Sequence, residues 1–98
     1  MVIAVVKYLI NEGKREELVE EIRSKQMEQR FSAQPGNVCF RYGVPVNEEN
    51  ALYLTDVWET EEAFEAHRSC DVMPDWKEIK DQYMTGNEIL QYDAQSVQ

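Results

Sequence analysis

Apolar and polar positions alternate through the middle of the chain in the manner of a β-hairpin. After the turn signal Pro35-Gly36, apolar side chains recur at every second residue from Val38 to Val46, the period of a strand with one buried face. Residues 47–50 are polar and acidic, which is typical of a turn, and residues 52–58 return as a second strand. One face of that second strand carries Leu52, Leu54, Asp56 and Trp58.

A short helix is predicted directly after the hairpin. Thr60 stands at the N-cap position, and Glu61 and Glu62 occupy the first turn, where carboxylates meet the positive end of the helix dipole. Residues three and four apart share a helix face, so we expect an inward stripe of Ala63, Phe64, Ala66 and His67. The single histidine of the chain is therefore predicted to point toward the sheet.

The N-terminal third predicts a strand and a long helix. Residues 2–10 are apolar at nearly every position, which favours a strand that is buried from both sides. A helix is expected from Lys14 to about Arg30, with a core stripe of Leu18, Val19 and Ile22. Met27 and Phe31 fall on a different side of this helix. Its end must therefore meet another apolar surface, either a pocket wall or a partner chain.

The C-terminal third predicts a second helix and a short strand. Residues 71–74 interrupt the helical pattern, and Pro74 suits the first turn of a new helix. Val72, Trp76, Ile79 and Tyr83 follow helical spacing. We expect Gly86 to close this helical region and residues 88–92 to form the last strand.

This order of elements predicts an α+β fold of the ferredoxin-like βαββαβ type, with an antiparallel sheet and helices on one face. We expect a single domain over residues 1–93 and a mobile tail over residues 94–98. The first strand is apolar on both sides, so the free face of the sheet needs cover. A second copy of the chain, packed sheet against sheet, would supply it, and we therefore expect a homodimer.

Size and charge narrow the classes of function. A chain of 98 residues makes one small domain with a modest core. Its net charge of −9 argues against nucleic acid and anionic membrane partners, since both recruit clustered Lys and Arg. A small uncharged or cationic ligand suits such a surface better. There is no signal-peptide pattern at the N-terminus and no apolar run near about 18 residues, so we expect a cytoplasmic protein.

The sequence offers little for a metal or an organic cofactor, and we expect neither. Cys39 and Cys70 lack CxxC spacing and are predicted to be reduced thiols. His67 has no carboxylates or thiols near it at ligand spacing, which disfavours a metal site. No Gly-rich phosphate loop is present to hold a nucleotide.

Four side chains are the first candidates for chemistry. His67 suits proton transfer near neutral pH, and its alternative is a hydrogen-bonded core histidine. Trp58 offers a ring on which a flat ligand could stack, and it would equally serve as a core anchor. Tyr42 could give its hydroxyl to a phenol-like substrate or simply pack in the core. Arg41 could hold an anion, although a surface or dimer ion pair suits it better.

A wider set of apolar and aromatic residues is expected to line a substrate site, with plain core packing as the alternative for each. The expected substrate-binding residues are Trp58, Tyr42, Phe40, Phe64, Met73, Trp76 and Tyr83, with Met27 and Phe31 as further wall candidates.

Several of these residues together resemble the antibiotic biosynthesis monooxygenase family, in its quinol-monooxygenase-like branch. The likeness covers roughly residues 2–92. It rests on Pro35, Gly36, Arg41, Tyr42, Asp56, Trp58, Glu61, Glu62, Ala63, Ala66 and His67. The resemblance implies a dimeric α/β barrel in which His67 lines a cavity between sheet and helices. Many relatives carry a second histidine shortly after this one, whereas this chain has Val72 and Met73 there, which puts a two-histidine mechanism in doubt.

The resemblance also implies a reaction. It points to a cofactor-independent monooxygenase acting on a small quinol or phenol-like substrate, which is itself the reductant for O₂. His67 would take the proton, Trp58 and Tyr42 would position the ring, and the protein would stabilise the anion and exclude water.

Three other functions share the fold. An isomerase or tautomerase of an enolisable substrate, like the branch that processes phosphorylated autoinducer-2, would need cations such as Arg41, Arg68 or Lys7. A non-enzymatic dimer that binds a small ligand would need His67 only as a structural residue. Haem degradation is disfavoured, because Trp76 and Lys77 stand where an axial histidine is needed. The sequence leaves oxygenation, isomerisation and ligand binding open.

Overall fold

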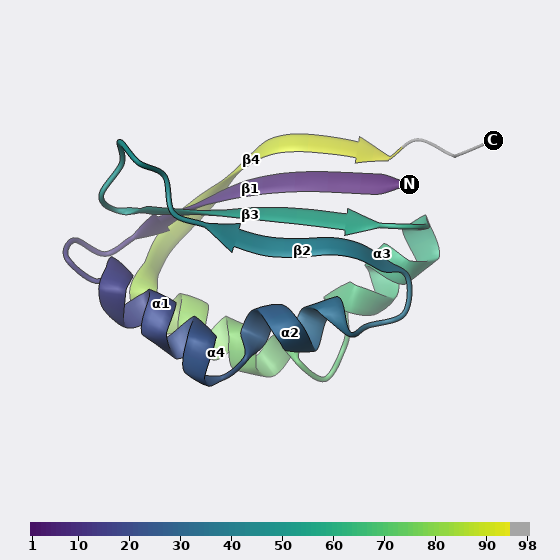
Figure 1. Cartoon of the computed structure of the whole chain (residues 1–98), viewed down its shortest axis with the longest axis horizontal. Helices are drawn as coiled ribbons and strands as arrows, with labels where there is room; N and C mark the ends of the chain where they lie inside the picture. The colour runs from purple at the N-terminus through teal and green to yellow at the C-terminus, as the bar shows by residue number, and fades with distance from the viewer. Residues whose placement is uncertain (95–98) are drawn as a thin grey trace.

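The computed structural model describes residues 1–94, which form four strands and four helices (Figure 1). The elements in chain order are β1 (Val2–Ile10), α1 (Arg15–Ser24), α2 (Met27–Ser32), β2 (Asn37–Gly43), β3 (Ala51–Trp58), α3 (Glu61–Arg68), α4 (Met73–Tyr83) and β4 (Met84–Ala94). The predicted tail began at residue 94, but Ala94 is the last residue of β4. The rest of that predicted tail lies outside the described residues.

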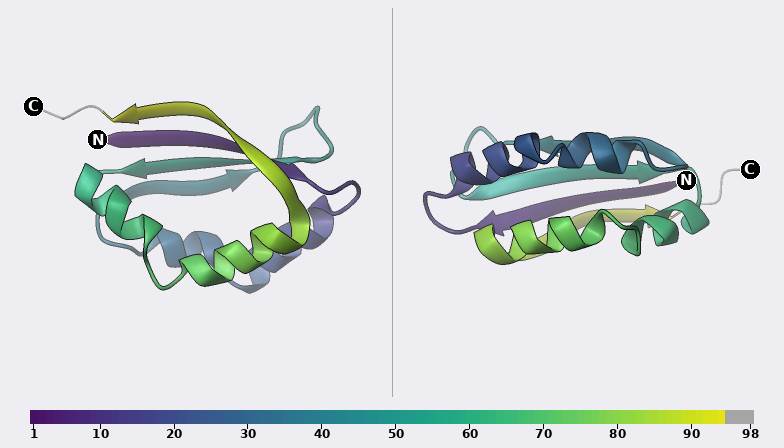
Figure 2. Two further views of the ribbon diagram at one scale, coloured as in Figure 1. Left: turned by 180° about the vertical axis from the view of Figure 1, so that it is seen from behind. Right: turned by 90° about the horizontal axis from the view of Figure 1, so that it is seen from below.

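The four strands form one antiparallel sheet in the order β2-β3-β1-β4. The central strand β1 pairs with β3 on one side, where Val2 lies opposite Trp58, and with β4 on the other. All four helices lie across the same face of the sheet, as the view from below makes clear (Figure 2). This arrangement confirms the predicted α+β ferredoxin-like fold.

The long helix predicted over residues 14–30 is wrong in one respect, because it is two helices. Gln26 takes a left-handed conformation, with φ of 53° and ψ of 41°, and separates α1 from α2. An unbroken helix would turn Met27 and Phe31 away from the stripe that holds Leu18. The break redirects both side chains into the core, where each is 0% exposed. Burial of two large apolar side chains offsets the cost of the strained residue.

The first strand of the hairpin is shorter than its alternation predicts. β2 ends at Gly43, so Val44 and Val46 belong to the loop and are exposed, Val46 to 97%. A register shift between Asn37 and Cys39 inserts Val38 as an extra residue and leaves it 52% exposed. Of the predicted stripe, Phe40 and Tyr42 alone keep their inward direction.

The last strand is longer than predicted. α4 ends at Tyr83 and β4 begins at Met84, so Gly86 lies within the strand and does not close the helix. The backbone N–H of Asn11 donates to the carbonyl of Tyr83 over 2.9 Å, and Met84 pairs with Ile10. Pairing along the whole of β1 therefore fixes the length of β4.

The face of β1 that is turned away from the helices carries Ile3, Val5 and Leu9, which are half-buried in the single chain. One side of β1 is thus buried as predicted, and cover of the other side by a second copy stays a prediction. Within residues 1–94, no helix is both long and apolar enough to cross a membrane.

Candidate functional site

The helix that carries His67 begins as the sequence predicts. Thr60 caps α3, and its hydroxyl accepts from the N–H of Ala63 over 3.1 Å. Phe64 and His67 are buried on its inner face. Ala66 was expected on that face and is exposed instead, because the residue before His67 lies about 100° away around the helix.

Aromatic rings enclose the imidazole. Trp58 stacks on His67 with ring centroids 4.6 Å apart and planes 28° apart, and Phe64 lies at 6.3 Å with planes 26° apart. Phe31 and Phe40 present their edges at 5.0 Å and 5.6 Å. His67 is consequently only 5% exposed. A ring held on several sides keeps one orientation, which is what a proton-transfer group requires.

Two polar side chains meet the two nitrogens of the ring. Nδ1 lies 3.0 Å from Oε1 of Gln34, to which it donates when protonated. Nε2 lies 3.8 Å from Oδ2 of Asp56. The other carboxylate oxygen, Oδ1, accepts from the indole Nε1–H of Trp58. His67, Asp56, Trp58 and Gln34 thus form a connected polar group, which we call the His67 cluster.

Burial shifts the pKa values of the two titratable groups of this cluster, Asp56 and His67. Burial raises the pKa of Asp56 to about 6, although donation from Trp58 and the charge of Arg68 oppose the rise. Burial likewise lowers the pKa of His67 to about 4, with a smaller contribution from Arg68. At neutral pH the carboxylate is therefore ionised and the imidazole is neutral, so the two do not form a standing ion pair.

A pocket of about 470 Å³ borders the imidazole between α3 and the connection from α2 to β2. Its lining is Gln34, Pro35, Gly36, Glu62, Ala63, Ala66, His67 and Cys70. Gly36 has a φ of +83°, and a Cβ there would come within 2.5 Å of the Ala63 Cβ. Only glycine allows the connection to approach α3 this closely. Nδ1 of His67 meets Gln34, which itself lines this pocket.

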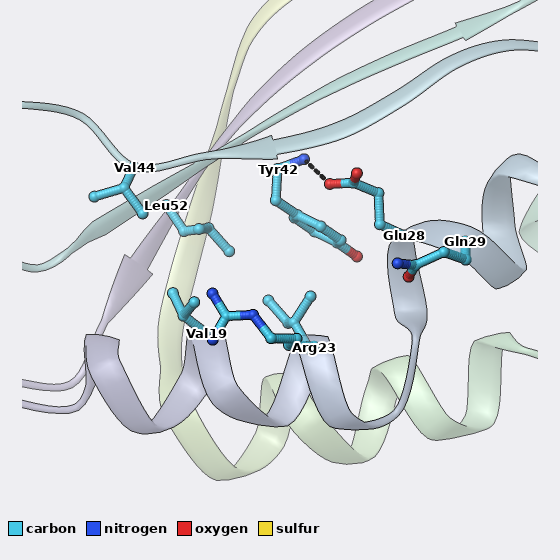
Figure 3. Close-up of a pocket in the computed structure, with 8 residues that line it drawn as sticks. Val19, Arg23, Glu28, Gln29, Tyr42, Val44 and Leu52 are labelled. Atoms are coloured by element: carbon cyan, nitrogen blue, oxygen red, sulfur yellow. Dashed lines mark hydrogen bonds between the residues drawn. The ribbon is translucent and has the colours of Figure 1, made fainter.

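A second pocket of about 240 Å³ lies between the sheet and the first two helices (Figure 3). It is lined by Val19, Ile22, Arg23, Glu28, Gln29, Tyr42, Val44 and Leu52. Tyr42 lines this pocket, and its hydroxyl is buried and has no hydrogen-bond partner among residues 1–94. Burial raises the pKa of this phenol well above its ordinary value of 10.

The predicted substrate-binding residues lie in four different places relative to His67. Trp58, Phe40 and Phe64 surround His67 directly. Tyr42 and Trp76 contact each other, with ring centroids 5.2 Å apart. They reach the His67 group only through Phe40, whose ring contacts both Tyr42 and His67. Met73 is partly buried against the same core. Tyr83 lies where the far end of β1 meets α4, because its carbonyl pairs with Asn11, and it does not join His67.

Other residues of the site had no predicted role. Asp56 was expected on the buried face with Trp58, and a carboxylate at an otherwise apolar inward position was the signal available for it. Gln34 precedes the Pro35-Gly36 turn and carries no such signal. Arg41 is exposed on β2, as a surface residue would be. Over residues 1–94, no three His, Cys, Asp or Glu side chains gather closely enough to hold a metal ion.

Comparison with protein families gives a match over residues 1–79 to the family described as antibiotic biosynthesis monooxygenase. No curated protein matches the chain in sequence.

Solved structures share the fold at low sequence identity. A Nitrosomonas europaea protein, provisionally named an antibiotic biosynthesis monooxygenase, superposes with a TM-score of 0.83 at 15% identity, covering 96% of this chain and 88% of that one. A Deinococcus radiodurans protein with the same provisional name gives 0.82 at 14% identity, covering 99% and 95%. A conserved Bacteroides thetaiotaomicron protein of unknown function gives 0.79 at 14%, covering 94% of each chain. From the family match over most of its length, this chain belongs to the antibiotic biosynthesis monooxygenase family.

Proposed function

We propose that the protein is a monooxygenase that uses no metal or flavin, acts on a small quinol or phenol-like substrate, and employs His67 as the proton acceptor. One observation carries the proposal. A neutral imidazole, held by aromatic rings, separates a pocket of about 470 Å³ from a buried carboxylate. Such a ring can receive a proton from the pocket while the carboxylate behind it balances the new charge.

The proton would move to Nδ1, the nitrogen that faces Gln34 of the pocket lining. The amide of Gln34 meets this nitrogen and can serve either tautomer, because rotation of the amide exchanges its carbonyl acceptor for its NH₂ donors. With Asp56 ionised, the tautomer with hydrogen on Nε2 is favoured, and a substrate hydroxyl that displaces the Gln34 amide would donate to the lone pair of Nδ1. The carboxylate of Asp56, 3.8 Å from Nε2, would then face the imidazolium and oppose the effect of burial, which lowers the pKa of His67.

The redox balance needs no outside electron donor. A hydroquinone that has lost a proton is electron-rich enough to reduce O₂ by one electron, and recombination of the two radicals gives a ring hydroperoxide. Loss of water from this species leaves a hydroxyquinone, so hydroquinone and O₂ become hydroxyquinone and H₂O. The role of the apolar pocket is to exclude water while the anion reacts.

We further propose that the protein works as a cytoplasmic homodimer. Apolar side chains on the open face of β1, namely Ile3, Val5 and Leu9, support sheet-to-sheet packing of two copies. Cys39 and Cys70 are free thiols, which suits a reducing compartment.

The isomerase acting on a sugar phosphate is a weaker candidate. A phosphate would need cations at the His67 pocket, whose lining instead includes Glu62. Lys7 pairs with Glu48, and the guanidinium of Arg68 lies over the Phe64 ring and pairs with Glu65. The third candidate, a ligand-binding dimer without catalysis, predicts that His67 can be replaced without loss of ligand affinity.

Oxygen consumption by the metal-stripped protein, measured over a panel of hydroquinones and polycyclic phenols, tests the proposal. We expect uptake that requires the protein and falls at least about tenfold in His67→Ala, a loss of about 1.4 kcal/mol of transition-state stabilisation. Arg41→Gln on the exposed face of β2 is the matched control and should keep full activity. Hydroquinone oxidation that is equally fast with His67→Ala would count against a proton-transfer role.

A further inference from the structure

The pocket beside His67 carries a negative charge at its outer margin. Among the described residues that line it, Glu62 alone has a formal charge at neutral pH, because the imidazole is neutral there. Glu62 is exposed, whereas His67 is buried. The carboxylate thus stands on the solvent side of the pocket and the imidazole on its inner side. A molecule that meets the imidazole with one end therefore has its other end near a negative charge.

The charge of Glu62 is not neutralised within residues 1–94, where its carboxylate forms no ion pair. The cation on the same helix is Arg68, which pairs with Glu65 over 3.5 Å. The Arg68 guanidinium also lies 4.5 Å from the centre of the Phe64 ring. The net charge of −9 for the whole chain has the same sign as Glu62. The mouth of this pocket therefore attracts cations and repels anions.

The walls between these two groups are small and apolar. Pro35, Ala63 and Ala66 line the pocket and have no side chain that can form a hydrogen bond. The close contact of Gly36 with Ala63 joins the connection to α3. A volume of about 470 Å³ holds one aromatic ring with a short substituent. The pocket thus has an apolar body with a proton acceptor at one end and a carboxylate at the other.

Helix geometry sets the length of a ligand that reaches both ends. Glu62 and His67 are five residues apart on α3, which corresponds to about 7.5 Å along the helix axis. A phenol with an amino group on a two-carbon chain has nearly this length from its oxygen to its nitrogen. A molecule of this kind can place its hydroxyl at the imidazole and its ammonium group at the carboxylate.

We propose that Glu62 determines the specificity of the His67 pocket, and that the preferred substrate is a phenol or quinol whose short side chain ends in an ammonium group. The inference rests on the proposed function, which places the substrate hydroxyl at His67. The ring then lies against Ala63 and Ala66, and the ammonium group faces Glu62. Phenols that carry a carboxylate or a sulfonate bind less tightly, because Glu62 repels them. Since Glu62 is exposed, its effect on affinity is about fivefold.

Three monophenols that differ only at the end of the side chain test this inference. Tyramine, 4-propylphenol and 3-(4-hydroxyphenyl)propionate carry an ammonium, a methyl and a carboxylate group on the same two-carbon linker. Their affinities for the full-length protein are measured by calorimetry without oxygen and at low ionic strength, so that turnover does not enter. We expect tyramine to bind at least about fivefold more tightly than the carboxylate probe. Equal affinity of these two probes, or no binding of any probe, would overturn the proposal.

Two isosteric variants separate the local charge from the net charge. Glu62→Gln should weaken tyramine about fivefold, strengthen the carboxylate probe about fivefold and leave 4-propylphenol unchanged. Glu61→Gln removes the same charge on the other side of α3, where Oε1 lies 3.5 Å from the Tyr92 hydroxyl, and should leave all three affinities within about twofold. Equal effects of the two variants would show that net charge alone selects the ligand, and would overturn the role of Glu62.

A third variant locates the binding. Ala66→Phe fills the pocket from the exposed side of α3 and should abolish binding of all three probes, whereas binding that survives this change occurs elsewhere and would overturn the proposal. The oxygenase is tested separately by oxygen uptake. Charge preference without any oxygen uptake would contradict the oxygenase alone. Oxygen uptake that requires His67, combined with equal affinity for the two charged probes, would contradict the role of Glu62 alone.

Discussion

Buried polar groups are paired at one end of the aromatic interior, around His67, and unpaired at the other end, around Tyr42. At the His67 end, the indole N–H, both carboxylate oxygens and both ring nitrogens lie within reach of one another or of Gln34. At the Tyr42 end, a buried hydroxyl has no partner among residues 1–94. The polar groups of the first end are thus paired within the protein, whereas the hydroxyl of the second is buried without a partner among residues 1–94.

The difference is also one of electrostatics. At the His67 end, burial shifts the pKa values of Asp56 and His67 in opposite directions, to about 6 and about 4. At the other end, burial raises the pKa values of the phenols of Tyr42 and Tyr8, the latter to about 12, so both stay neutral. Of these four buried groups, only Asp56 and His67 titrate below pH 7. Four substitutions test this contrast between the His67 end and the Tyr42 end.

The largest effect is expected for Trp58→Phe. This change keeps an aromatic ring but leaves a cavity and removes the donor to Asp56, so we expect a loss of about 4 kcal/mol in the free energy of unfolding. The pKa of Asp56 would rise further, and the loss should be greater at pH 8, with the carboxylate ionised, than at pH 5. Urea unfolding at both pH values measures this. An equal loss at both would mean that the indole N–H does not serve the carboxylate.

Asp56→Asn separates the two titrations of the His67 cluster. Asp56 has a raised pKa, so its contribution to stability is complete below about pH 4 and is lost as pH rises through about 6. His67 has a lowered pKa, and its protonation costs stability as pH falls from 6.5 to about 4. The two terms oppose each other in the unaltered protein.

The variant keeps an acceptor for Trp58 and retains the His67 term alone. Between pH 6.5 and 4 it should lose about 3 kcal/mol more stability than the unaltered protein, at about 1.4 kcal/mol per pKa unit. Subtracting the curve of the unaltered protein removes the contribution of the surface carboxylates. Parallel curves would show that Asp56 and His67 do not titrate in this range.

Gly36→Ala should damage the His67 pocket through the backbone. Both the positive φ and the contact with Ala63 oppose a Cβ, so we expect a loss of about 2 kcal/mol. Gly43→Ala is the control, because a Cβ there meets nothing within 4 Å, and it should stay within about 0.5 kcal/mol. Thermal unfolding of both variants makes the comparison. Similar losses in the two would contradict a special role for the backbone of Gly36.

Tyr42→Phe has the smallest expected effect and the opposite sign. Removal of a buried hydroxyl without a partner should raise the free energy of unfolding by about 1 kcal/mol, whereas removal of a satisfied one costs about that much. Urea unfolding in the absence of any ligand is the measurement. A decrease would mean that ordered water already completes the hydrogen bond, and the contrast between the two ends would weaken.

The local pattern of apolar and polar residues was sufficient to predict most helices and strands of the fold. Alternation along residues 52–58 placed Leu52, Leu54, Asp56 and Trp58 on the buried face, and all four are buried. Helical spacing likewise turned His67 inward. These features depend on the fixed periods of strands and helices, so neighbouring residues in the sequence are enough to specify them. Irregularities were not visible in this way, because the break at Gln26 and the bulge at Val38 are decided by what the core can accommodate.

The sequence by itself determined the family, the ferredoxin-like order of elements, and the inward direction of Asp56, Trp58 and His67. Only the tertiary structure decided that Gln34 completes the His67 cluster, that Phe31 packs its edge on the imidazole, that Tyr83 stays away from it, and that Phe40 contacts both His67 and Tyr42. These relations join segments far apart in the chain, and their distances follow from how α2, α3 and β2 pack. Packing is a property of the whole core, which no local period contains.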